Sequence, residues 1–348
     1  MVRDARAKHP GLTVAALGGP ELAAAGAQLL HDLTASSVVG LVEVLKNYSY
    51  FQALFRATLD WIEAHRPRAV CFIDYPGFNL RLARALHEQK LSVKGGGPIR
   101  LLFYISPQIW AWKARRRFTM AQHLDALAVI FPFEVKCYAD TDLPVEFVGH
   151  PFLAPEHEAP VYYDPSAPVL LLPGSRRQAV ARIFPVLLAG YRASGTDRPA
   201  IVLHPSEAIR LVLEQQPRPA EVRLQQGGGA PLPASAVLTS SGTMSMHCAL
   251  AGIPGAIAYR ANPVTYLIGR RLVKVPYLGI ANLLLEEPMY PEYLQHAATP
   301  EALAGELRDC LANPARRQQA QRHAARLRAI LAQPATGTAA DWLLRHLG

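Results

Sequence analysis

The stretch Val169-Leu-Leu-Leu-Pro-Gly-Ser-Arg176 decides the fold class of this chain. Its leading apolar residues predict a strand buried on both faces, and its Pro-Gly-Ser turn runs directly into a helical pattern over residues 177–193. Strands of this kind, alternating with helices, are typical of parallel α/β sheets. The other expected strands are 12–17, 69–74, 99–105, 127–131, 200–204, 236–239 and 255–259, and the other expected helices are 41–65, 80–89, 206–215 and 244–251.

The alternation stops between residues 151 and 168, which contain five prolines and no clear periodicity. Such a segment is typical of an interdomain linker. Each half of the chain then has the size of one doubly wound domain. Two doubly wound domains that face a cleft predict that ligands bind at the carboxyl ends of the strands.

The composition excludes several classes of protein. With 348 residues, of which 50% are hydrophobic and 18% charged, the chain is too apolar to be disordered. No uninterrupted apolar run reaches the roughly 18 residues of a transmembrane helix. The opening MVRDARAKHP has no apolar segment behind its charges, so we expect no secretory signal. The four cysteines lie far apart without metal-ligand spacing, so we expect no metal site.

The net charge of +9 favours an anionic partner. Phosphates, nucleic acid and an acidic lipid surface all remain open on charge alone. The chain contains neither a GxGxxG nor a GxxxxGK[ST] pattern, so NAD-linked chemistry and P-loop chemistry are not indicated.

Two strand-to-helix turns in the second half are candidates for binding a diphosphate. Gly174, Ser175 and Arg176 combine the free N–H groups of a helix start with a guanidinium group. The alternative is an ordinary turn with a solvated arginine. The turn Ser241-Gly242-Thr243 offers hydroxyls at a second helix start, and its alternative is plain N-capping. Two such turns in one half favour a shared nucleotide ligand.

Two features of the first half are also candidates for function. Asp74 ends a buried strand, where a carboxylate can act as a general base or can cap the following helix. The run Ile105-Ser-Pro-Gln-Ile-Trp-Ala-Trp112 is followed by Lys113 and by arginines at 115–117. This group of aromatic and basic residues could hold an amphiphilic anion, stack on nucleic-acid bases or fill an edge of the core.

Two further features have no partner visible in the sequence. The arginine-rich segment 316–328 is expected to be mainly a solvated helix face, with a role at a membrane surface as the alternative. His150 and His247 are the histidines worth marking, although a histidine in such a position is usually structural.

Several of these stretches, with others, together resemble the lipid-A-disaccharide synthase family. They occur in the family's order along nearly the whole chain: Gly40-Leu-Val-Glu-Val-Leu45, Ile73-Asp-Tyr-Pro-Gly-Phe-Asn79, Tyr104-Ile-Ser-Pro-Gln-Ile-Trp-Ala-Trp112, Phe131-Pro-Phe-Glu134, Phe147-Val-Gly-His-Pro151, Leu172-Pro-Gly-Ser-Arg176, Ser241-Gly-Thr243, Tyr259-Arg260, Arg271-Leu-Val-Lys274 and Ala281-Asn-Leu-Leu284. The stretch with two tryptophans is highly specific. The Leu-Pro-Gly-Ser-Arg and Ser-Gly-Thr turns alone are weaker, because other nucleotide-sugar enzymes share them.

The resemblance implies an α/β fold of the GT-B type, with two Rossmann-like, doubly wound domains facing a cleft. The implied domains are an acceptor-side domain over residues 1–155 and a nucleotide-sugar-binding domain over residues 156–334. A final helix within residues 335–348 is expected to pack back on the first domain.

The reaction that the resemblance implies joins UDP-2,3-diacylglucosamine to 2,3-diacylglucosamine 1-phosphate with inversion and releases UDP. Such a displacement needs one base and stabilisation of the departing diphosphate. The implied site residues are Asp74 as the base, Gly174, Ser175, Arg176, Ser241, Gly242 and Thr243 on the nucleotide side, and Asn282 as a functional asparagine. No metal or other cofactor is implied. The expected partners are the donor, the acceptor, an anionic membrane surface and a second copy in a homodimer, but not nucleic acid. The expected location is the cytoplasm, peripheral on the inner membrane.

The chain departs from the family's pattern in three places. The family opens with a strand and a GExSGD turn, whereas this chain begins at the following helix, so we expect the first strand of the N-terminal domain to be absent. His247 and Ala179 stand where the family usually has glutamates. An alternative function is therefore that of a non-catalytic or truncated relative that binds a UDP-sugar or an acyl-sugar phosphate without turnover.

Overall fold

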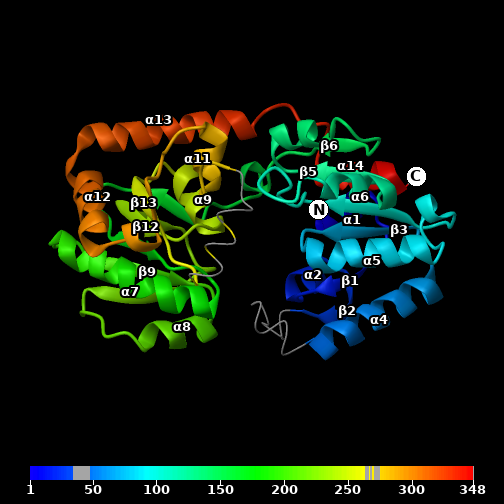
Figure 1. Ribbon diagram of the computed structural model, residues 1–348, viewed down its shortest axis with the longest axis horizontal. Helices are drawn as coiled ribbons and strands as arrows, with labels where there is room; N and C mark the ends of the chain where they lie inside the picture. Colours follow the sequence, from blue (N-terminus) through cyan, green and yellow to red (C-terminus); the bar gives the residue numbers. More distant parts are fainter. Residues whose placement is uncertain (34–47, 263–265, 267–268, 270–274, 348) are drawn as a thin grey trace. The chain divides into compact units, whose positions relative to one another are not determined.

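The computed structural model of the protein describes residues 1–33, 48–262, 266, 269 and 275–347. The chain forms two compact units, one of Met1–Pro151 with Ala332–Gly348 and one of Phe152–Leu331 (Figure 1). The first unit is called unit 1 below and the second unit 2. Their boundaries lie at residues 151 and 331, where the sequence leads us to expect 155 and 334. Every described strand pairing is parallel, which confirms the predicted α/β class.

Unit 1 holds two parallel sheets, one of two strands in the order β1-β2 and one of four strands in the order β3-β4-β5-β6. Its elements are α1 (Val2–Lys8), β1 (Ala15–Gly18), α2 (Pro20–Ala24), β2 (Gln28–Asp32), α4 (Tyr48–His65), β3 (Ala69–Ile73), α5 (Pro76–Glu88), β4 (Arg100–Tyr104), α6 (Arg116–His123), β5 (Ala126–Val129), the 3-10 segment Pro132–Tyr138, β6 (Val145–Phe147) and α14 (Ala339–Leu347). The middle strands β4 and β5 are almost fully buried because apolar residues occupy both of their faces.

The last helix, α14, completes the core of unit 1. Trp342 is fully buried in a cluster that includes Leu102 and Ala126 from the sheet and Ala5 from α1. An ion pair between Lys8 and Asp341 links α1 to the start of α14. The two ends of the chain therefore belong to one hydrophobic core.

Unit 2 is built on a six-stranded parallel sheet in the order β10-β9-β8-β12-β13-β14. Its elements are β7 (Val161–Tyr163), β8 (Val169–Leu172), α7 (Arg177–Ser194), β9 (Ala200–His204), α8 (Glu207–Glu214), β10 (Val222–Gln226), β11 (Leu232–Ala234), β12 (Ala236–Thr239), α9 (Thr243–Leu250), β13 (Gly255–Tyr259), α11 (Ile280–Leu285), β14 (Glu292–Leu294), α12 (Pro300–Ala312) and α13 (Pro314–Leu331).

Helices cover this sheet in two groups. Helix α7 packs against α12, while α9 and α11 pack against α13 (Figure 1). A Cβ atom at Gly190 of α7 would lie 2.6 Å from the Cβ of Leu303 of α12, so only glycine allows the two helices to approach this closely.

The structure departs from the sequence expectations in short, partly exposed elements. Residues 161–163 lie in the expected linker, yet they form β7 and pair with β11. Strands β2, β6, β10, β11 and β14 were likewise not expected, because their alternation of apolar residues is weak or very short. The stretches 40–45 and 271–274, and the start of the helix expected at 41, lie outside the described residues. Among the helices of the described residues, none is long and apolar enough to cross a membrane.

Replacing Trp342 by alanine is expected to lower the free energy of unfolding by about 3–5 kcal/mol, because a large buried side chain is lost and a cavity remains. Trp342→Phe is expected to cost less, since it also removes a buried indole N–H that has no partner among the described residues. Urea unfolding followed by circular dichroism measures both variants. Val93→Ala, at a 45% exposed position of the same unit, is the control. Equal losses in all three variants would contradict this packing.

Candidate functional site

The strand order of unit 2 reverses between β8 and β12, which is where ligands bind in open parallel sheets. The loops that leave these two strands lie against each other. The backbone N–H of Ser240 donates a hydrogen bond to the carbonyl of Leu172 over 2.8 Å. Gly174 has a φ of +106°, and a Cβ there would lie 3.1 Å from the Oγ of Ser240. The positive φ therefore favours glycine in this turn, and a larger residue would also require the Ser240 side chain to shift.

The two loops bring two helix N-termini together at this point. Arg176 is the exposed N-cap of α7, and the first hydrogen bond of that helix runs from Val180 N–H to the Arg176 carbonyl. Helix α9 begins at Thr243 directly after Gly242, and both residues are exposed. The predicted residues of the two turns, 174–176 and 241–243, thus lie near one another. Unbonded N–H groups and an arginine form a site of positive potential suited to a diphosphate.

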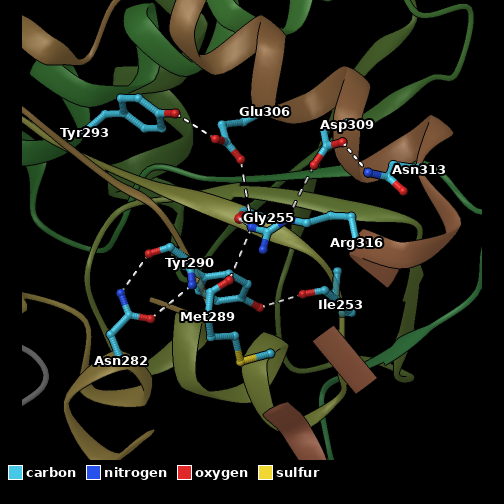
Figure 2. A network of polar contacts seen from close by, with 10 residues as sticks. All are labelled: Ile253, Gly255, Asn282, Met289, Tyr290, Tyr293, Glu306, Asp309, Asn313 and Arg316. Atoms are coloured by element: carbon cyan, nitrogen blue, oxygen red, sulfur yellow. Dashed lines mark hydrogen bonds and ion pairs between the residues drawn. The ribbon is translucent and has the colours of Figure 1, made fainter. Parts of the chain in front are cut away.

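Asn282 is placed differently from these residues, because it is fully buried. Its Nδ2 donates to the Tyr290 carbonyl over 2.7 Å, and its Oδ1 accepts from the Tyr290 N–H over 3.0 Å (Figure 2). The Nδ2 also donates to Glu292 Oε1 over 2.8 Å. The Asn282 amide is therefore occupied by protein groups, and it is linked to the Ser241 turn only through its neighbours.

The carboxylate of Glu292 links the Asn282 amide to the loop that contacts the Ser241 turn. Besides the Asn282 amide, it accepts the backbone N–H groups of Leu278 and Gly279, each over 2.8 Å. The Leu278 carbonyl in turn accepts a hydrogen bond from Ser241 Oγ over 3.3 Å. Asn282 and Glu292 therefore hold the loop against which the Ser241 turn rests.

His247 lies one helical turn beyond Thr243 on α9 and is only 8% exposed. Its ring stacks on Phe152 with a centroid distance of 3.8 Å and on His157 with a centroid distance of 5.2 Å. Burial, reinforced by the nearby His157, lowers the pKa of His247 to about 4. The imidazole is therefore neutral at physiological pH. Ala179, the other departure from the family pattern, lies in the first turn of α7.

Asp74 in unit 1 lies directly after β3 on a constrained backbone. Asp74 and Tyr75 have φ values of +45° and +43°, in a region that residues other than glycine rarely adopt. The Asp74 N–H donates to the Tyr104 carbonyl over 3.0 Å, and Asn79 Nδ2 donates to the Asp74 carbonyl over 2.7 Å. These bonds compensate part of the strain and hold the Asp74 backbone in place.

The Asp74 carboxylate itself is exposed and accepts no hydrogen bond from any residue that the structure describes. The N-cap of α5 is Tyr75, without a side-chain cap. The capping alternative for Asp74 is therefore wrong, and the carboxylate is left available at the carboxyl edge of the sheet.

Glu134 is a further candidate, which the sequence analysis noted only as the end of the stretch Phe131-Pro-Phe-Glu134. It follows β5 at the same edge of the sheet and is 2% exposed. Its carboxylate accepts the Trp110 indole N–H over 3.2 Å and the Phe131 N–H over 3.1 Å. Burial raises the pKa of Glu134 to about 7, and these hydrogen bonds only partly oppose the shift. In the sequence, a glutamate directly after two phenylalanines and a proline was the feature that could have indicated a buried carboxyl group. His150 is also buried near this loop, with its ring against Phe131.

Comparison with known proteins bears on both units. A sequence model of a family described as lipid-A-disaccharide synthetase matches residues 1–341. The lipid-A-disaccharide synthase of Geobacter metallireducens is 34% identical over 344 residues, covering 94% of this chain and 88% of its own. That of Trichlorobacter lovleyi is 36% identical over 340 residues, covering 92% of this chain and 86% of its own.

Solved structures show the same fold at low sequence identity. The calicheamicin glycosyltransferase CalG4 aligns with a TM-score of 0.56 at 17% identity, over 100% of this chain and 94% of its own. A putative UDP-N-acetylglucosamine 2-epimerase of Listeria monocytogenes aligns with a TM-score of 0.58 at 13% identity, over 99% of this chain and 90% of its own. The predicted GT-B fold is thereby confirmed.

His247 is expected to make stability depend on pH. Its pKa of about 4 in the folded chain lies below the ordinary 6.5, so the unfolded chain binds the proton first as the pH falls. The stability of the wild type relative to His247→Phe, which keeps a stacked ring, should be constant above pH 6.5 and fall toward pH 4. Urea unfolding across this range measures the difference. A difference that does not vary with pH would show that His247 is not buried in this stack.

Glu134 is expected to change the stability with pH in the opposite direction to His247. Its pKa of about 7 lies above the ordinary 4.5, so the folded chain retains the proton longer as the pH rises. The stability of the wild type relative to Glu134→Gln should be greatest below pH 4.5 and should decline as the pH rises through 7. Urea unfolding across the same pH range measures this difference in stability. If the difference rose with pH instead, the Glu134 carboxyl group could not be buried as described.

Proposed function

Because the chain belongs to the lipid-A-disaccharide synthase family, we propose that it transfers 2,3-diacylglucosamine from UDP to 2,3-diacylglucosamine 1-phosphate. The family and the fold make the chain a glycosyltransferase of lipid A biosynthesis. The transfer forms a β-1,6 link, releases UDP and inverts the configuration at the donor's anomeric carbon. A single in-line displacement accounts for one inversion. The comparisons lend no support to a binding-only relative.

The main observation in support of the proposal is the exposed Asp74 carboxylate, whose backbone is held by hydrogen bonds with Tyr104 and Asn79. In the proposed reaction this carboxylate accepts the proton of the acceptor's 6-hydroxyl while the oxygen attacks the donor. Its fixed backbone lowers the cost of orienting the base in the transition state.

The two turns of unit 2 supply the other requirement of the reaction. As the bond to the anomeric carbon breaks, negative charge accumulates on the departing diphosphate. Arg176 and the N-termini of α7 and α9 place positive charge where the diphosphate would lie, which stabilises that charge without reorganisation. Asn282 serves as a positioning residue, since its amide holds Glu292 and thereby the loop under the Ser241 turn.

Asp74→Asn is expected to lower kcat by about 10²–10⁴-fold with little change in KM, because the amide cannot accept the proton and yet keeps the size of the side chain. Release of UDP from the two acyl-sugar substrates measures the rate. Asp60→Asn, at an exposed position of α4, is the matched control and should behave as the wild type. A wild-type rate for Asp74→Asn would rule out its role as the base, and no release of UDP by the wild type would rule out the reaction.

A further inference from the structure

Glu134 is a buried carboxyl group that has no role in the proposed transfer. It lies in the 3-10 segment Pro132–Tyr138 and is 2% exposed. A carboxylate is costly to bury unless hydrogen bonds replace those that it makes with water. Each oxygen of Glu134 has such a bond: Oε1 accepts the indole N–H of Trp110 over 3.2 Å, and Oε2 accepts the backbone N–H of Phe131 over 3.1 Å. The two donors belong to different loops, and one carboxylate therefore joins those loops.

The bond to Phe131 is local. Phe131 is the N-cap of the 3-10 segment, and a side chain three residues further on often accepts the N–H of the residue at this position. A single acceptor oxygen is sufficient for this bond, so glutamine at position 134 would preserve it. The Phe131 bond therefore does not account for an acid at this position.

The bond to Trp110 connects the 3-10 segment to the loop that follows β4. We call residues 105–112 the Trp110 loop. The Trp110 ring lies edge-to-face against Phe133, with a centroid distance of 5.6 Å. At the beginning of the loop, Ser106 Oγ lies 2.7 Å from the hydroxyl oxygen of Tyr138. The 3-10 segment thus holds the Trp110 loop at two points.

The Trp110 loop begins beside Asp74. The Asp74 N–H donates to the carbonyl of Tyr104, the residue directly before the loop, over 3.0 Å. Strands β3 and β4 are parallel neighbours, so Asp74 and the loop leave the sheet at the same edge. Ile109, in the middle of the loop, is 3% exposed and belongs to the core of unit 1. An acceptor whose hydroxyl reaches the Asp74 carboxylate therefore lies next to an anchored loop.

We infer that Glu134 is a positioning residue for the acceptor: it holds Trp110, and thereby the part of the Trp110 loop that contacts the acceptor sugar. The inference rests on the proposed function, because that function supplies the acceptor. A loop that is already ordered binds its ligand without an additional cost of ordering. Glu134 therefore contributes to the affinity for the acceptor, whereas Asp74 contributes to the chemical step.

Glu134→Gln tests whether a carboxylate is needed. The amide has one acceptor oxygen, so it can keep the Phe131 bond but then places its NH2 group against the Trp110 indole N–H. Two facing donors form no hydrogen bond, and Trp110 is no longer held. KM for the acceptor is expected to rise at least about tenfold, with kcat within about threefold of the wild type and KM for the donor unchanged. Release of UDP at about pH 8.5, above the Glu134 pKa of about 7, measures these constants.

Trp110→Phe removes the other partner of the same bond. It deletes the indole N–H but keeps an aromatic ring against Phe133, and it is expected to raise KM for the acceptor by the same factor as Glu134→Gln. Because both changes remove one contact, the double variant should raise this KM no further than either single variant. Effects that multiply in the double variant would overturn the inference, since Glu134 would then act independently of Trp110.

Glu88→Gln and Trp61→Phe are the matched controls, which make the same chemical changes elsewhere in unit 1. Glu88 pairs with Arg84 on the exposed surface of α5, and Trp61 of α4 stacks on His65. Both variants should keep the wild-type KM for the acceptor. Circular dichroism shows whether each variant is folded, and Trp110→Phe decides the matter if Glu134→Gln is not. A folded Glu134→Gln with the wild-type KM for the acceptor would overturn the inference.

Direct binding separates this inference from the proposed function. Calorimetry with the acceptor in detergent micelles gives its Kd without turnover, and the Kd of Glu134→Gln is expected to be at least about tenfold that of the wild type. A wild type that forms no disaccharide but shows this difference in Kd would refute the proposed function and support the positioning role. Disaccharide formation by the wild type, with equal Kd values for the two proteins, would overturn the positioning role and support the proposed function.

Discussion

Parallel strand pairing is the constraint on which both units depend. A strand cannot reach a parallel neighbour through a tight turn, so each connection must cross the sheet, usually as a helix. Every strand of a sheet consequently ends at the same edge, and the loops that leave it are gathered there. In unit 1 this edge carries Asp74 and the loop that contains Glu134, and in unit 2 it carries the turns after β8 and β12. Polar residues far apart in sequence become neighbours without any requirement on the residues between them.

The loops at these edges are held by carboxylates that bind the protein's own N–H groups. Glu134 accepts from the Trp110 indole and the Phe131 backbone, while Glu292 accepts from two backbone N–H groups and the Asn282 amide. Bonds to a carboxylate are stronger than those to a neutral oxygen, and loops have few other contacts to order them. Such a glutamate is bonded within the protein, and it fixes the position of the loop residues beside it.

The sequence located the buried strands well and the short ones poorly. Strands β8, β9, β12 and β13 were predicted to within one residue, because short apolar runs that alternate with longer helical patterns are typical of strands buried on both faces. Strands β7 and β11 pair only with each other over three residues each, which leaves no periodic pattern to recognise. The positions of the two turns of unit 2 were also predicted, since glycine and hydroxyl residues between a strand and a helix indicate a turn there. The positive φ of Asp74 and the inward direction of Asn282 were not predictable, because long-range contacts impose both.

The burial of Trp342 has a consequence for the order in which the chain is synthesised. Unit 2 is one continuous segment, Phe152–Leu331, and all of it has been translated before Trp342 is added. Leu102 and Ala126, against which α14 packs, are made much earlier and lack their cover until then. The core of unit 1 can therefore close only at the end of translation, and the apolar surface around Leu102 and Ala126 stays uncovered while the whole of unit 2 is being made.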